Sequence, residues 1–185
     1  VVINRLCDAQ PETLYGDTLG RAVFCIGTLA LTVLLWRVLN PDQPLLAELV
    51  AGQQFVFNCA AQTSHPLSIQ EPLFDAEINC LGNLKLLETL RRHNRDAIVV
   101  YTSSSTVIGR AVGEMVDETH GERPLDIYSA NKGVAEKYYR IYHRVHDLKT
   151  VTVRFANLYG PYGKGFPEFG FVNYFIHVAR TGGTI

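Results

Sequence analysis

The chain has 185 residues, of which 47% are hydrophobic and 19% are charged. This composition fits one globular domain and excludes a disordered, collagen-like or low-complexity chain. The 17 basic and 18 acidic residues give a net charge of -1, so no general positive field would attract nucleic acid, and we expect no such partner.

In chain order, strand-like and helix-like segments alternate. Residues 1–3 resemble the end of a strand, and β-branched or continuous apolar runs predict strands at 22–26, 55–57, 97–101 and 150–155. Helices are predicted at residues 29–39, 44–51, 75–93, 128–146 and 171–180, with loops at 7–20 and 157–170. Strands separated by helices indicate an α/β fold with a mostly parallel sheet flanked by helices.

Residues 22–36 form an apolar stretch without a charged side chain. A membrane-spanning helix needs about 20 apolar residues, so this stretch is too short. It also lacks the basic start and the small-residue cleavage site of a signal peptide. Gly27 and Thr28 divide it into the predicted strand and helix. We therefore expect no membrane partner and a cytoplasmic location.

The four cysteines show no metal-site or redox spacing. Cys7, Cys25, Cys59 and Cys80 include no C-x-x-C pair, and no histidine cluster adjoins them in the sequence. We expect reduced thiols buried for structural reasons, and no bound metal. His65 and His120 fall in predicted loops and suggest no role.

In open parallel sheets, ligands bind beyond the carboxyl ends of the strands, which here are residues 59–63, 102–106 and 156–162. Nearby, Tyr128 and Lys132 stand four residues apart and share one face of a predicted helix. An ammonium lowers the pKa of a neighbouring phenol, so such a pair can act as an acid and base. Ser103, Ser104 and Ser105 supply hydroxyls that could complete such a site. The alternative is a half-buried ring and a solvated amine without chemical function.

Six segments, taken together and in this order, resemble the extended short-chain dehydrogenase/reductase family, which includes the NAD-dependent nucleotide-sugar epimerases and dehydratases. The segments are residues 55–62, 79–83 (Asn-Cys-Leu-Gly-Asn), 101–109 (Tyr-Thr-Ser-Ser-Ser-Thr-Val-Ile-Gly), 128–132 (Tyr-Ser-Ala-Asn-Lys), 154–161 and 171–179. The resemblance implies a Rossmann-like fold and transient hydride transfer at a sugar carbon.

The resemblance also implies roles for individual residues. Tyr128 would be the acid/base on a sugar hydroxyl, Lys132 would lower its pKa and hold the nicotinamide ribose, and Ser104 would share the substrate proton. Asn157 would face the nucleotide-sugar, such as a UDP-sugar. The residues expected to bind the cofactor are Cys59, Ala60, Ala61, Asn79, Thr102, Tyr128 and Lys132.

The family pattern begins with a strand and a G-x-x-G-x-x-G loop that binds the cofactor pyrophosphate. No such run occurs here. We therefore expect a partial dinucleotide-binding domain at residues 1–155, the start of the nucleotide-sugar region at 156–185, and truncation at both ends. NAD is the expected cofactor. Arg5 stands near the position that contacts the adenosine ribose, where an arginine would accommodate the 2′-phosphate of NADP.

Three functions remain open at this point. The first is an epimerase, favoured over a dehydratase because no acidic residue follows Ser104 as it does in the dehydratases' Thr-Asp-Glu. The second is such a dehydratase. The third is a Rossmann-like scaffold without catalysis or bound cofactor, or a dimerisation module. The resemblance implies a homodimer formed through helices 75–93 and 128–146.

Overall fold

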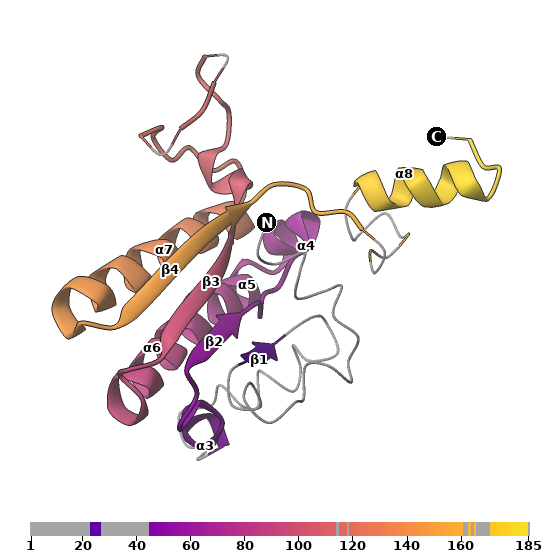
Figure 1. Ribbon diagram of the computed structural model, residues 1–185. Helices are drawn as coiled ribbons and strands as arrows, with labels where there is room; N and C mark the ends of the chain where they lie inside the picture. The colour runs from indigo at the N-terminus through magenta and orange to yellow at the C-terminus, as the bar shows by residue number, and fades with distance from the viewer. Residues whose placement is uncertain are drawn as a thin grey trace.

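Figure 1 shows the computed structural model of the chain. It describes residues 23–26, 45–113, 115–117, 119–160, 163, 165 and 171–184. The predictions for residues 1–20 and for a helix at 29–39 lie outside the described residues, as do Cys7 and the side chain of Cys25.

Four parallel strands form the sheet in the order β1-β2-β3-β4. They are β1 (Val23–Ile26), β2 (Phe55–Asn58), β3 (Ile98–Ser104) and β4 (Lys149–Phe155), and all four were predicted. β3 extends beyond its predicted end because its backbone pairs with β4 as far as Ser104 opposite Phe155. The strands run in one direction, so Asn58 and Ser104 reach the same edge of the sheet (Figure 1).

The helices follow the predicted order with two differences. The segment predicted as one helix at 75–93 is α5 (Pro72–Ala76), the π-helical turn η2 (Glu77–Leu81) and α6 (Gly82–His93). The helix α4 (His65–Gln70) was not predicted, because six residues are too few to show a helical period. The remaining elements are α3 (Leu45–Val50), the 3-10 turn η3 (Ser105–Ile108), α7 (Ile127–His146) and α8 (Phe171–Arg180).

The core lies between the sheet and the helices α6 and α7, which cover one of its faces (Figure 1). Leu87 and Leu90 of α6 are buried in this core together with Val99 of β3. Tyr101 of β3 stacks on Tyr139 of α7 with ring centroids 4.6 Å apart. This packing fixes α7, the helix that carries the Tyr-x-x-x-Lys motif, against the sheet.

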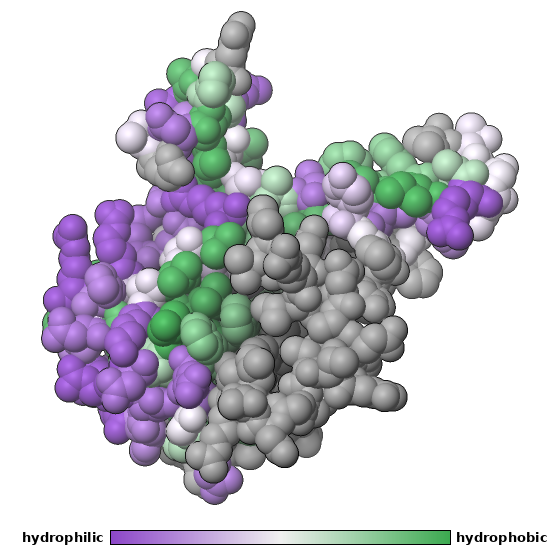
Figure 2. Space-filling model, viewed as in Figure 1, coloured by the Kyte–Doolittle hydropathy of each residue, from purple (hydrophilic) through white to green (hydrophobic). Residues whose placement is uncertain are grey.

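α8 extends away from the sheet beyond the end of β4 (Figure 1). Figure 2 shows apolar side chains on it, and Phe171, Phe175 and Ile176 are exposed. The separation is compatible with the predicted boundary between residues 155 and 156, which stays a prediction. Within the described ranges, no helix combines the length and the apolar character needed to cross a bilayer.

Gly109, which ends η3, occupies a place that only glycine fits. Its φ is 66°, and a Cβ built there would lie 1.6 Å from the backbone oxygen of Arg123. We expect Gly109→Ala to lower the free energy of unfolding by about 2 kcal/mol or more, because strain and a backbone clash add. Urea unfolding measures this. Gly113 is the matched control, since it also has a positive φ but open space around its Cβ; an equal loss in Gly113→Ala would contradict the clash argument.

Candidate functional site

Tyr128 lies in the first turn of α7, close to the carboxyl edge of the sheet. Asp126 caps this helix, because its Oδ1 accepts a hydrogen bond from the Ser129 N–H at 2.7 Å. Tyr128 is buried, and burial raises the pKa of its phenol, while a hydrogen bond with Ser104 acts in the opposite direction. The sequence predicted a lowered pKa for Tyr128. This is wrong for the structure as it stands, because desolvation dominates.

Lys132 is buried one helical turn after Tyr128. Its Nζ donates to the Thr102 backbone oxygen at 2.5 Å and lies 4.4 Å from the centroid of the Tyr101 ring. Burial lowers the pKa of Lys132 to about 8, because the charged form is desolvated. A buried ammonium at the end of β3 is not the solvated amine of the alternative interpretation.

The serine run divides between two roles. Ser103 points toward α7, where its hydroxyl donates to Glu136 Oε1 at 2.5 Å. Ser104 lies on the Tyr128 side: its Oγ accepts from the Thr106 N–H at 3.2 Å and caps η3. Ser104 also has a side-chain hydrogen bond with Tyr128, whereas Ser103 is bound to Glu136. This contact favours Ser104, as the resemblance implied.

The loop after β2 is built by an internal polar cluster. Asn58 donates to Asn83 Oδ1 at 2.8 Å and to the Tyr139 hydroxyl at 3.0 Å, and its own Oδ1 accepts from the Ala60 N–H at 3.2 Å. These contacts fix the backbone at Cys59 and Ala60, where the sequence placed cofactor-binding residues. Cys59 itself is half-buried, and Cys80 is buried as expected.

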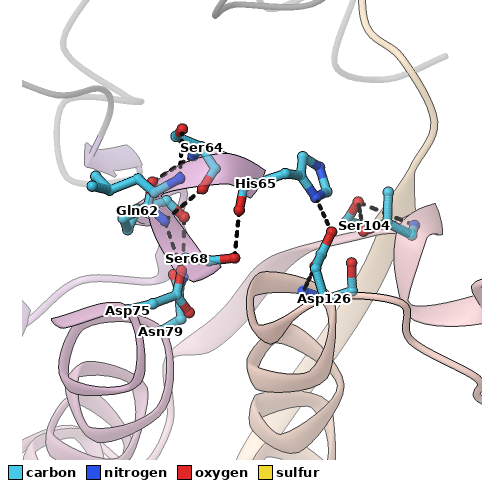
Figure 3. A network of polar contacts seen from close by, with 11 residues as sticks. Gln62, Ser64, His65, Ser68, Asp75, Asn79, Ser104 and Asp126 are labelled. Carbon is cyan, nitrogen blue, oxygen red and sulfur yellow. Dashed lines mark hydrogen bonds and ion pairs between the residues drawn. The ribbon is translucent and has the colours of Figure 1, made fainter. Parts of the chain in front are cut away.

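A second cluster joins this loop to α5, η2 and α7 around a buried carboxylate (Figure 3). Asp75 accepts hydrogen bonds from Gln62 Nε2 at 2.7 Å and from Asn131 Nδ2 at 2.8 Å. Asn79 donates to the Gln62 backbone oxygen at 3.0 Å, while its buried Oδ1 has no partner among the described residues. The Asn-x-x-Gly-Asn and Tyr-x-x-x-Lys motifs are therefore linked through Asp75.

Sequence reasoning missed a pair beside Tyr128. His65, which the structure places in α4 rather than in a loop, has its Nδ1 2.5 Å from Asp126 Oδ2 (Figure 3). The two residues are 61 positions apart, so no local pattern could link them. The sequence offered one signal, Asp126, because aspartate is a preferred N-cap residue and stands just before the predicted helix.

The other predicted site residues differ in burial and in their distance along the chain from the strand ends. Ala60 is buried, while Ala61 and Thr102 are half-buried near the ends of β2 and β3. Asn157 lies in the exposed segment after β4. Its role toward a nucleotide-sugar stays a prediction.

Comparison with known proteins decides which family this constellation represents. A family model for NAD dependent epimerases/dehydratases matches residues 23–185, which include all six segments that carry the resemblance. The chain belongs to the NAD dependent epimerase/dehydratase family. Its parallel sheet is accordingly the Rossmann-like sheet that the resemblance implied.

Members of this family with both predicted activities resemble the chain. The UDP-glucose 4-epimerase of Thermotoga maritima, solved with UDP-glucose, is 28% identical with a TM-score of 0.71, over 78% of this chain and 48% of that one. The Thermus thermophilus UDP-glucose 4-epimerase, solved with NAD, is 31% identical with a TM-score of 0.67, over 82% and 46%. The dTDP-glucose 4,6-dehydratase of Streptomyces niveus is 33% identical over 127 residues, 69% of this chain and 37% of that protein. The chain thus spans less than half of each relative.

Substitution of Ser104 tests how the serine run is divided. The resemblance makes Ser104 the hydroxyl that shares the substrate proton, and on that expectation Ser104→Ala should lower kcat about tenfold to a hundredfold, because one hydrogen bond is lost. Ser105→Ala, in the adjoining turn, is the control and should keep the activity of the parent protein. Steady-state kinetics with a UDP-sugar measures both. A larger loss in Ser105→Ala than in Ser104→Ala would contradict this division.

Proposed function

We propose that the chain is the central part of an NAD-dependent nucleotide-sugar epimerase acting on a UDP-sugar. The observation that carries this proposal is the convergence of Tyr128, Ser104 and Lys132 at the carboxyl edge of a parallel sheet. A phenol, a hydroxyl and an ammonium from two adjoining elements suit proton transfer at a sugar hydroxyl. The family membership and the epimerase relatives support the same activity.

The described residues suit the nicotinamide-ribose end of NAD. The Lys132 ammonium has three N–H donors, and one of them meets the Thr102 oxygen. Its remaining donors suit the hydroxyls of a ribose, beside the fixed backbone of Cys59 and Ala60. When bound, the cofactor would accept a hydride from a sugar carbon and return it. We propose NAD over NADP because the Thermus thermophilus relative was solved with NAD.

The chain's own residues would handle the proton. Burial keeps the Tyr128 phenol protonated at neutral pH in the free protein. To act as a base it needs a nearby positive charge, and Lys132 on the same helix face provides one. Ser104, hydrogen-bonded to Tyr128, would hold the substrate hydroxyl and pass its proton to the Tyr128 oxygen once that oxygen has released its own proton and is a phenolate.

The runner-up is a dehydratase, which the Streptomyces niveus relative supports. An epimerase is preferred because the residues after Ser104 are Ser105, Thr106 and Val107, without a carboxyl group to assist the loss of water. A scaffold without catalysis is disfavoured because it would not need the desolvated charge of Lys132.

We also propose a homodimer through the outer faces of η2, α6 and α7. Leu81, Ile141 and Val145 leave 50%, 51% and 65% of their surface exposed there. Ile141 and Val145 lie four residues apart on one face of α7, and an exposed apolar strip of this kind supports a protein–protein contact. Sedimentation velocity should show a species of twice the chain's mass; a monomer at every concentration would contradict it.

The proposed function has a direct test. NAD+ and NADP+ are titrated into the protein by calorimetry, and UDP-hexoses are then followed by ¹H NMR of their anomeric protons. We expect NAD+ binding and a new anomeric signal from a sugar epimer. A 4-keto-6-deoxy product would support the dehydratase, and no binding at millimolar cofactor would support the scaffold.

A further inference from the structure

His65 of α4 contacts Tyr128 and pairs with Asp126, the cap of α7, and the proposed function gives neither side chain a role. The His65 ring meets the Tyr128 ring edge-on, with centroids 4.7 Å apart and an interplanar angle of 70°. Its Nδ1 lies 2.5 Å from Asp126 Oδ2. Tyr128 is thus in contact with a histidine whose own orientation is fixed by a carboxylate.

We propose that the His65–Asp126 pair positions Tyr128 for proton transfer. The inference rests on the proposed function, because fixing the phenol matters only if Tyr128 is the acid/base. His65 is a positioning residue here, since it acts through the Tyr128 ring.

The Asp126 carboxylate is held at both of its oxygens. Oδ1 accepts from the Ser129 N–H at 2.7 Å and so caps α7, while Oδ2 meets His65. The contacts with Ser129 and His65 outweigh the effect of burial and lower the pKa of Asp126, so it is ionised at neutral pH. A fixed carboxylate at the start of the helix thereby ties α4 to the turn that carries Tyr128.

His65 is anchored on its own side as well. Its backbone oxygen accepts the Ser68 hydroxyl at 2.7 Å, and Ser64 caps α4 through the Leu67 N–H at 3.3 Å (Figure 3). The first turn of a helix otherwise loosens easily. A displacement of about 1 Å at a reacting group can cost about a hundredfold in rate, so this restraint should matter for kcat.

Four variants separate the two contacts. His65→Phe keeps a ring beside Tyr128, His65→Asn keeps a donor for Asp126, and His65→Ala keeps neither. Asp126→Ser keeps a helix cap but removes the partner of His65. We expect His65→Ala to lower kcat about tenfold or more with little change in KM, and His65→Phe and His65→Asn to recover part of the loss. His65→Ala with Asp126→Ser should lose no more than His65→Ala alone, because the two act as one unit.

A second readout does not depend on turnover. Burial raises the pKa of Tyr128, so in protein labelled with ¹³Cζ-tyrosine its NMR titration should move down in His65→Ala and stay high in His65→Phe. His93→Ala, at the exposed end of α6, is the control for both measurements. Unchanged kcat and unchanged titration in His65→Ala, or additive losses in the double variant, would overturn the inference.

Tyr128→Phe, measured alongside, separates this inference from the proposed function. If Tyr128→Phe abolishes turnover while the His65 variants behave like the parent, the positioning inference fails alone. If Tyr128→Phe keeps full turnover, the proposed function fails with it. His65→Phe retains the apolar packing of the ring and keeps the test valid should His65→Ala fail to fold.

Discussion

Tyr128→Phe is expected to reduce turnover of a UDP-sugar by about a hundredfold to ten-thousandfold, the range for loss of a positioned acid/base group. Only the phenolic hydroxyl is removed, and the ring remains to pack against His65 at its present 4.7 Å centroid distance. We therefore expect the affinity for NAD+ and the free energy of unfolding to change little. Steady-state kinetics, calorimetry and urea unfolding measure the three quantities.

Tyr138→Phe is the matched control for this substitution. Tyr138 lies on the same helix but is only half-buried, at the margin of the core. Its variant should turn over substrate like the parent protein. The assignment of Tyr128 would be wrong if the two variants had similar activity, or if Tyr128→Phe lost activity only in proportion to lost folding.

Lys132→Met is expected to lower kcat about a hundredfold or more, because a preorganised charge at the site is removed. Its effect on stability should be the reverse of that expected for a structural salt bridge. Burial disfavours the charged form of Lys132, so an apolar side chain of similar length should leave the protein at pH 7 as stable as before or more stable. Loss of activity without loss of stability would mark a residue kept for function.

The lowered pKa of Lys132 also predicts how the free energy of unfolding changes with pH. The pKa of Lys132 is lowered from 10.5 to about 8, so the unfolded chain binds more protons between these values. The free energy of unfolding should therefore gain a rising contribution with pH in this window, which Lys132→Met should lack. Lys137→Met, an exposed lysine paired with Glu122, is the control and should retain it. Identical pH profiles for the parent protein and Lys132→Met would contradict the burial of a charged Lys132.

The strands, the long helices and the catalytic motif could be predicted from the sequence because their signals are local. β2 and β3 are short apolar runs, and α7 shows its period over 20 residues. Tyr128 and Lys132 share a helix face by spacing alone. The family resemblance added the choice of Ser104 among three serines, and the hydrogen bond between Ser104 and Tyr128 agrees with it.

The features of the site that could not be predicted depend on contacts between segments far apart in the sequence. Aspartate side chains are usually exposed to solvent. Asp75 is buried because Gln62 and Asn131 both donate hydrogen bonds to its carboxylate. The raised pKa of Tyr128 is set by how deeply α7 packs, which the i and i+4 spacing does not encode. α4 and its His65 were missed because a six-residue helix shows no period, and its partner lies on another element.

In the proposed epimerase, a sugar C–H bond is broken and remade within one protein molecule. A UDP-hexose carrying deuterium at the carbon that inverts tests it most directly, with the product analysed by ¹H NMR and mass spectrometry. We expect an epimer that keeps its deuterium, with no net change in absorbance at 340 nm. A product that has lost the deuterium to solvent, or no epimer from protein shown to bind NAD+, would contradict it.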